Sequence, residues 1–103
     1  MTIYFVTRHP GAMDWANGQG FSVDVQLAHL EPESVQTGDC VIGSLPVNLA
    51  ARICQRGGRY VHLSLELPFV LRGCELTAAE MTAFGAKLEG FSIHPGEPCK
   101  ETS

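Results

Sequence analysis

One junction constrains the fold of this chain more than any other feature. It lies between a short apolar segment, Ile3–Val6, and the turn that follows it. Residues 2–7 form a nearly continuous apolar strand, a pattern typical of a parallel sheet covered on both faces. The next residues, Thr7-Arg8-His9-Pro10-Gly11-Ala12, hold a cation, an imidazole, a proline that fixes the backbone and a glycine that allows close approach. The junction predicts a strand-to-helix unit of an open α/β sheet, whose ligands bind at the carboxyl ends of strands.

Strand and helix patterns alternate along the rest of the chain, so we predict a small Rossmann-like, three-layer α/β domain with a mostly parallel sheet. A strand order such as 2-1-3-4 is usual for such domains. Apolar and polar residues alternate at 21–27, which predicts an edge strand, and residues 31–39 predict a one-turn helix. The predicted helices cover 11–19, 46–56 and 78–88, and the predicted strands cover 2–7, 21–27, 40–43, 60–65 and 91–93.

Two of the predicted helices carry specific sequence signals. Thr77 and Glu80 form a capping box, and Leu76 and Met81 are placed to form the hydrophobic staple around it. Pro46 begins the other helix, because proline lacks an N–H that the first turn does not need. On the predicted helix 78–88, the apolar positions predict a core face of Met81, Phe84 and Leu88. On the predicted helix 46–56, they predict a core face of Val47, Ala50, Ala51 and Cys54.

Size and composition limit the classes of function. The 103 residues make one domain, predicted at 1–93, with a flexible polar tail at 94–103. The hydrophobic share of 45% against 17% charged residues predicts a rather apolar surface and favours a homodimer. A net charge of −4 argues against binding long DNA or RNA. No paired C-x-x-C motif, secretory segment or membrane span is present, which predicts a cytoplasmic protein with reduced thiols.

Three segments follow predicted strands and should converge at one edge of the sheet, namely residues 7–12, 43–48 and 64–72. Arg8 and Arg72 can donate to phosphate oxygens in a planar fork, and Trp15 can stack on a base. This set of residues suits a small phosphate-bearing ligand. The candidate ligand-contacting residues are Arg8, His9, Gly11, Trp15, Gly43, Ser44, Asn48, Ser64, Glu66 and Arg72.

Structural interpretations of these residues stay open beside the functional ones. A lone tryptophan such as Trp15 is more often part of a core, and His62 inside a strand is more often a satisfied buried histidine. Gly11 and Gly43 suit tight strand-to-helix turns, and Ser64 suits the end of a strand. Clustered carboxylates for a metal, a phosphate-binding loop and a dinucleotide-binding fingerprint are all missing from the sequence, so we expect neither metal nor cofactor.

Four separated segments carry a family resemblance that covers about residues 2–90. They are Thr-Arg-His-Pro-Gly-Ala at 7–12, Gly-Asp-Cys-Val-Ile-Gly-Ser-Leu-Pro-Val at 38–47, Gly-Gly-Arg-Tyr-Val-His-Leu-Ser-Leu-Glu-Leu-Pro at 57–68 and Arg-Gly-Cys-Glu-Leu-Thr at 72–77. Together they resemble the CRISPR-associated Csx-sixteen family of type III systems.

The resemblance implies a homodimeric Rossmann-like domain related to the CARF sensors of cyclic oligoadenylates. It also implies a ring nuclease that opens this second messenger, with cyclic tetra-adenylate as the expected substrate. Metal-free transesterification fits, since the ribose 2′-hydroxyl is the nucleophile. Arg8 and His9 are then the expected catalytic residues, and Ser44, Asn48 and Arg72 the expected ligand-orienting residues.

Two other functions compete with cleavage. The same donors bind ground state and transition state, so the chain can equally be a protein that sequesters the cyclic nucleotide without cutting it. A third class, the histidine phosphatases, shares the adjacent Arg8 and His9. Here Pro10 replaces the glycine of that motif, and the chain is half the usual size.

Overall fold

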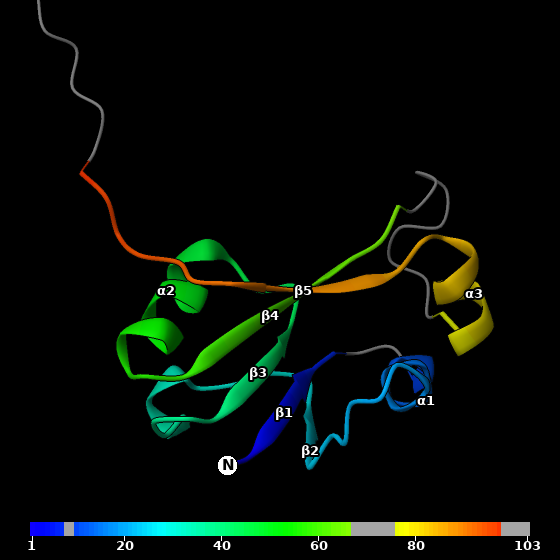
Figure 1. The fold of residues 1–103 in the computed structure, drawn as a ribbon, viewed down its shortest axis with the longest axis horizontal. Helices are drawn as coiled ribbons and strands as arrows, with labels where there is room; N and C mark the ends of the chain where they lie inside the picture. Colours follow the sequence, from blue (N-terminus) through cyan, green and yellow to red (C-terminus); the bar gives the residue numbers. More distant parts are fainter. Residues whose placement is uncertain (8–9, 67–75, 98–103) are drawn as a thin grey trace, which may run out of the picture.

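A computed structural model describes residues 1–7, 10–66 and 76–97, which form a five-stranded sheet in the order β2-β1-β3-β4-β5 (Figure 1). The first four strands in this order are parallel, and β5 runs antiparallel to β4. The predicted α/β class, the mostly parallel sheet and the edge position of the second strand are confirmed. The strands are β1 (Ile3–Val6), β2 (Val25–Leu27), β3 (Cys40–Gly43), β4 (Arg59–Ser64) and β5 (Lys87–Phe91).

Helices cover both faces of the sheet (Figure 1). On one face, α1 (Pro10–Gly18) packs beside α3 (Ala78–Ala83). On the other face lie α2 (Val47–Gln55) and the short 3-10 helix η1 (Pro32–Ser34), which is the predicted single turn. None of the described helices is long and apolar enough to cross a membrane.

The central strand β3 explains why the apolar segments of the sequence are continuous. Successive side chains of a strand point to opposite faces. Ile42 packs with Phe5 in the cluster under α1 and α3, whereas the neighbouring Val41 packs with Ile53 of α2. All four residues of β3 are buried, so every position of this strand needs an apolar or small side chain.

The last predicted helix is too long, and the last predicted strand begins too late. The capping box of Thr77 and Glu80 is present, but α3 ends before Gly85, whose φ of +72° lies in the left-handed region. The amide of Ala86 bonds the carbonyl of Met81 at 2.9 Å and closes the helix. Leu88 therefore belongs to β5, where it still packs against the same core as Met81.

The predicted core face of α2 is rotated relative to the observed one. Ala50, Ala51 and Ile53 are buried, whereas Cys54 is only partly buried and Val47 is 73% exposed. The buried arc is centred near Ala50 and includes Ile53, which the prediction omitted. Val47 then falls at the margin of the arc and faces solvent.

Candidate functional site

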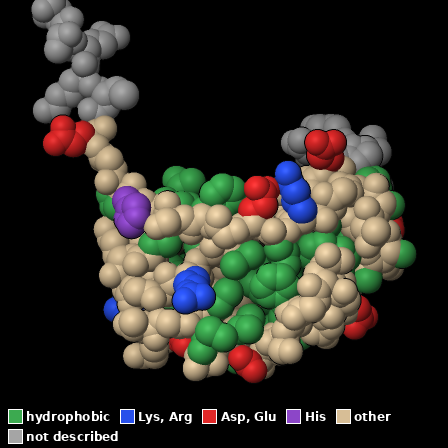
Figure 2. All heavy atoms as spheres, viewed as in Figure 1, with side chains coloured by type: hydrophobic (Ala, Val, Ile, Leu, Met, Phe, Trp, Pro, Cys, Tyr) green, Lys and Arg blue, Asp and Glu red, His purple; other side chains and the backbone are tan. Residues whose placement is uncertain are grey.

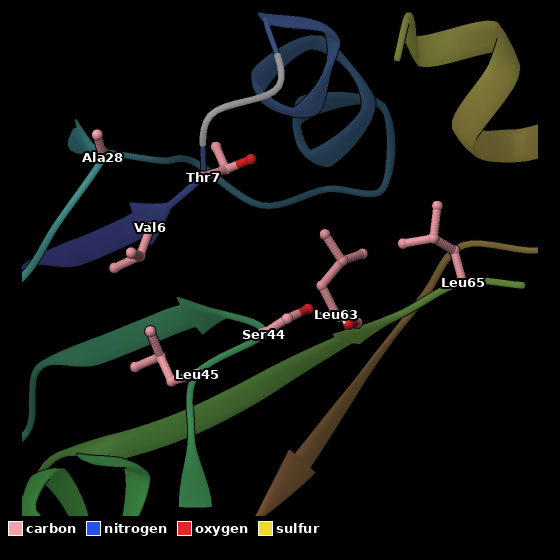
Figure 3. A pocket seen from close by; sticks show the side chains of 7 residues that line it. All are labelled: Val6, Thr7, Ala28, Ser44, Leu45, Leu63 and Leu65. Atoms are coloured by element: carbon pink, nitrogen blue, oxygen red, sulfur yellow. Dashed lines mark hydrogen bonds between the residues drawn. The ribbon is translucent and has the colours of Figure 1, made fainter. Parts of the chain in front are cut away.

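A cavity of about 330 Å³ lies at the carboxyl ends of the four parallel strands. Each strand ends at this edge because all four run in the same direction. Hydrophobic side chains gather on the surface around the ends of β1 and β4 (Figure 2). The cavity is lined by Val6, Thr7, Ala28, Ser44, Leu45, Leu63 and Leu65 (Figure 3).

The chemistry of this lining is apolar with two hydroxyls. None of the seven lining residues is charged, and only Thr7 and Ser44 carry polar side chains. An apolar wall with a few polar groups suits a flat organic group such as a nucleobase. A phosphate held here needs donors from outside this lining.

Ser44 is a predicted site residue that the structure places in the cavity wall. Its hydroxyl donates to the carbonyl oxygen of Leu63 at 2.5 Å, which ties the loop after β3 to β4 (Figure 3). A hydroxyl that has given its one proton still offers lone pairs. Ser44 can therefore accept a hydrogen bond from an amino or hydroxyl group of a ligand.

Gly43 and Gly11 allow close approach of backbone. A Cβ on Gly43 would lie 3.0 Å from the carbonyl oxygen of Val6. A Cβ on Gly11 would lie 2.4 Å from the amide nitrogen of Ala78, and the Gly11 amide bonds the Leu76 carbonyl at 3.3 Å. Gly11 thus packs the start of α1 against the start of α3 and is not among the residues that line the cavity.

The amino terminus of α2 adds an electropositive end near the same edge of the sheet. Pro46 is the N-cap residue, and the first turn holds no acidic side chain. Free amides and the helix dipole make such an end favourable for an anion. Asn48, another predicted site residue, is exposed on this first turn, outside the lining of the cavity.

The remaining predicted site residues are divided between the core, a neighbouring cavity and segments outside the described residues. Trp15 is 4% exposed and packs in the core under α1, so its indole is not available to stack on a ligand. Ser64 lines a separate cavity of about 340 Å³ with Glu66 and Lys87, and Leu65 lines both cavities. Arg8, His9 and Arg72 lie outside the described residues.

Sequence reasoning missed Tyr60, a core residue that holds the cavity wall. Its hydroxyl lies 3.0 Å from the amide nitrogen of Leu45, and burial raises the pKa of the hydroxyl, which stays protonated. The apolar lining residues Leu45, Leu63 and Leu65 were also missed. Their only signal in the sequence is that each stands within two residues of the end of a predicted strand.

Within the part of the chain that the structure describes, no group of three or more His, Cys, Asp or Glu side chains could hold a metal ion. A family model described as "Putative CRISPR-associated protein (Cas_VVA1548)" matches residues 4–94. The chain belongs to this CRISPR-associated family. No curated protein and no solved structure gives a significant match.

The Cas_VVA1548 match includes every residue of the candidate site, from Val6 to Arg72. It spans the whole described sheet, from β1 to β5, apart from Ile3. The family description supplies a CRISPR association and names neither a ligand nor a reaction.

Proposed function

We propose that this Cas_VVA1548 protein is a ring nuclease that binds and cleaves a cyclic oligoadenylate second messenger in type III CRISPR defence. The observation that carries the proposal is the cavity at the carboxyl ends of β1 to β4, in a chain of a CRISPR-associated family. Its apolar wall suits an adenine, and its two hydroxyls suit the polar edge of a base or a ribose. Cyclic tetra-adenylate is the proposed substrate, and the cytoplasm is the proposed location.

The proposed reaction is transesterification without a metal ion. The ribose 2′-oxygen attacks the adjacent 3′-phosphorus, the bond from phosphorus to the 5′-oxygen breaks, and a 2′,3′-cyclic phosphate forms. The 2′-hydroxyl loses its proton and the departing 5′-oxygen gains one, so no oxidant or cofactor takes part. Because the substrate supplies its own nucleophile, the protein needs only to align the ribose and stabilise charge on the phosphorus.

The proposed roles follow from residue chemistry. Arg8 donates to the phosphate oxygens, and His9 transfers a proton or stabilises the leaving oxygen. Ser44 and Asn48 orient the ligand at the start of α2, with Arg72 as a second cation. A homodimer suits this ligand, since a twofold axis doubles the cations and matches the symmetry of a ring with four phosphates.

Arg8→Ala tests the proposed catalytic role. We expect single-turnover cleavage of cyclic tetra-adenylate to slow roughly 100-fold, the scale of losing one donor that stabilises the transition state. The matched control is Arg59→Ala, because Arg59 is exposed at the amino end of β4, away from the carboxyl edge. Cleavage by the Arg8 variant at the wild-type rate would remove Arg8 from the mechanism.

Binding without cleavage is the second candidate function, and one observation favours it. The cavity lining that the structure describes has no titratable side chain, so this part of the site can hold a base but cannot move a proton. A sequestering protein would return the ring intact after incubation with excess protein. A ring nuclease would return linear product.

A further inference from the structure

The Tyr60 hydroxyl is the centre of a small hydrogen-bond network at the end of β3. Tyr60 is 2% exposed, so water does not satisfy its hydroxyl. The oxygen lies 3.0 Å from the amide nitrogen of Leu45, 3.0 Å from the carbonyl oxygen of Gly43 and 2.7 Å from Nδ1 of His62. Three partners surround a group that has one proton and two lone pairs.

Counting protons over these three contacts determines the tautomer of His62. The Gly43 carbonyl can only accept, so the Tyr60 hydroxyl must donate its single proton there. The Leu45 amide donates into one lone pair of the hydroxyl oxygen. The third contact is a hydrogen bond only if Nδ1 of His62 carries a proton and donates into the second lone pair. In the neutral imidazole, Nε2 is then the unprotonated nitrogen.

The opposite assignment brings two buried oxygens together without a proton between them. If Tyr60 donated to an unprotonated Nδ1 of His62, the two oxygens of Tyr60 and Gly43 would face each other at 3.0 Å without a proton between them. Two oxygens this close repel each other when neither donates a proton to the other. The network therefore favours the Nδ1-protonated tautomer.

The network holds residues 43–45, which are the last residue of β3 and the two residues that follow it, and this segment forms part of the wall of the candidate site. Each of these three residues contacts β4 through a side-chain hydrogen bond: Gly43 through its carbonyl and Leu45 through its amide, both to the Tyr60 hydroxyl, and Ser44 through its hydroxyl to the Leu63 carbonyl. Ser44 and Leu45 line the cavity, and α2 begins two residues later. A shift of residues 43–45 would change the shape of the cavity and the position of the start of α2 together.

Aromatic contacts hold the imidazole of His62 in place. Its ring centroid lies 5.8 Å from that of Tyr60, and 6.1 Å from that of Phe91, which it meets edge to face at 74°. Edge-to-face contacts of this kind stabilise a specific ring orientation. His62 is thus fixed by β5 on one side and by Tyr60 on the other.

We propose that Tyr60 and His62 are positioning residues of the site: the Tyr60 hydroxyl, with His62 in the Nδ1-protonated tautomer, holds residues 43–45 in the shape that binds the ligand. The effect on the ligand rests on the proposed function. The tautomer and the hydrogen bonds that hold residues 43–45 do not depend on it.

The first experiment needs no ligand. Long-range proton–nitrogen NMR spectra of the wild type should show His62 protonated at Nδ1, and Tyr60→Phe should release it to the ordinary Nε2-protonated form. Hydrogen exchange at the Leu45 amide should be slow in the wild type and at least about 10-fold faster in Tyr60→Phe, since one hydrogen bond is lost. Tyr4→Phe is the control, because Tyr4 lies on β1 outside this network. A wild-type His62 protonated at Nε2, or a Leu45 amide indifferent to Tyr60→Phe, overturns the proposal.

The second experiment uses cyclic tetra-adenylate and two side chains of similar size at position 62. His62→Asn keeps an N–H donor near the Nδ1 position, whereas His62→Leu removes it. We expect His62→Leu and Tyr60→Phe to weaken ligand binding about tenfold, as for one lost hydrogen bond, and His62→Asn to retain it. Equal binding by all three variants overturns the positioning role. A wild-type protein that neither binds nor cleaves the ring overturns the proposed function instead. The NMR and hydrogen-exchange results then show on their own whether Tyr60 and His62 hold residues 43–45.

Discussion

At the scale of single residues, Gly11 shows how the start of α1 depends on the absence of a side chain. Gly11→Ala would bring its Cβ to 2.5 Å from the carbonyl carbon of Thr77 and 2.6 Å from the carbonyl oxygen of Leu76, and backbone cannot move aside as a flexible side chain can. We expect a loss of about 1–3 kcal/mol in the free energy of unfolding, measured in urea. Gly18→Ala, in the same helix with nothing within 4 Å of its Cβ, should be neutral or stabilising. Equal stability of the two variants would contradict the packing account.

Asp39 is the residue whose ionisation should affect stability at acid pH. The buried carboxylate accepts hydrogen bonds from the amides of Gln36 and Thr2, both at 2.9 Å. The Gln36 bond, followed by the Thr2 bond, holds the pKa of Asp39 below its ordinary value. A lowered pKa in the folded state means that the contribution to stability is complete above the ordinary aspartate pKa and is lost as the pH falls through the lowered one.

Asp39→Asn should therefore unfold at lower urea concentration than the wild type near neutral pH, because the amide group replaces one acceptor with a donor. The difference should shrink as the pH falls below the ordinary aspartate pKa, since the wild type then loses the same charge. Urea midpoints for both proteins across the acid range test this. A difference that stays constant with pH would rule out the ionised carboxylate as its source.

The roles of single residues were harder to predict from the sequence than the helices and strands. The interaction of a nucleotide base with Trp15 was an open alternative, and the structure places that indole in the core. The interpretation of His62 as a histidine with a hydrogen-bond partner inside the protein agrees with the structure, since its Nδ1 lies 2.7 Å from the Tyr60 hydroxyl. Nothing in the sequence paired those two residues with the loop after β3, because that pairing depends on the register between β3 and β4.

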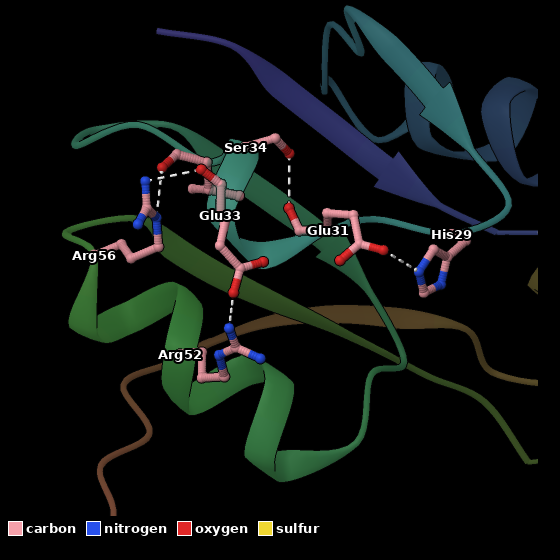
Figure 4. A network of polar contacts seen from close by, with 7 residues as sticks. His29, Glu31, Glu33, Ser34, Arg52 and Arg56 are labelled. Carbon is pink, nitrogen blue, oxygen red and sulfur yellow. Dashed lines mark hydrogen bonds and ion pairs between the residues drawn. The ribbon is translucent and has the colours of Figure 1, made fainter.

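At the scale of elements, two arginines join α2 to η1 by different kinds of contact (Figure 4). Arg52 forms an ion pair with Glu33, and both side chains are more than half exposed. Arg56 instead donates to two backbone carbonyls, those of Val35 at 3.0 Å and Glu33 at 2.8 Å. Both arginines also lie near the carboxyl end of α2, where a cation is favourable.

Arg56→Ala should lower the free energy of unfolding by about 1–2 kcal/mol, because it leaves two carbonyls without a charged donor. Arg52→Ala should change it by about 0.5 kcal/mol or less, since exposed ion pairs contribute little. Urea unfolding of both variants in low and high salt provides the measurement, and only the Arg52 effect should fade with salt. A larger loss for Arg52→Ala would contradict this ranking.

Elements with strong local signals were predicted well. The capping box at Thr77 and Glu80 is formed by reciprocal bonds of 3.2 Å and 3.0 Å, and β3 has the predicted bounds. The end of α3 was missed because Gly85 competes with a continuing apolar pattern that includes Leu88, and the pattern suits a helix and a strand equally. Antiparallel pairing with β4 decided between them.

At the scale of the whole molecule, the order of strands and the edge at which they end were predictable from the alternation of strands and helices. The convergence of residues 43–48 with the ends of β1 and β4 follows from that order. The apolar character of the cavity was not predictable, because it depends on which face each strand residue takes near its carboxyl end. The proposed site thus joins an apolar wall found in the structure to cations expected from the sequence.

Incubation of excess protein with labelled cyclic tri-, tetra- and hexa-adenylate, in the presence of a chelator, tests the central claim most directly. We predict linear products ending in a 2′,3′-cyclic phosphate, formed at the same rate with and without chelator and fastest from the tetra-adenylate ring. Recovery of every ring intact, or cleavage that stops when the chelator is added, would contradict it.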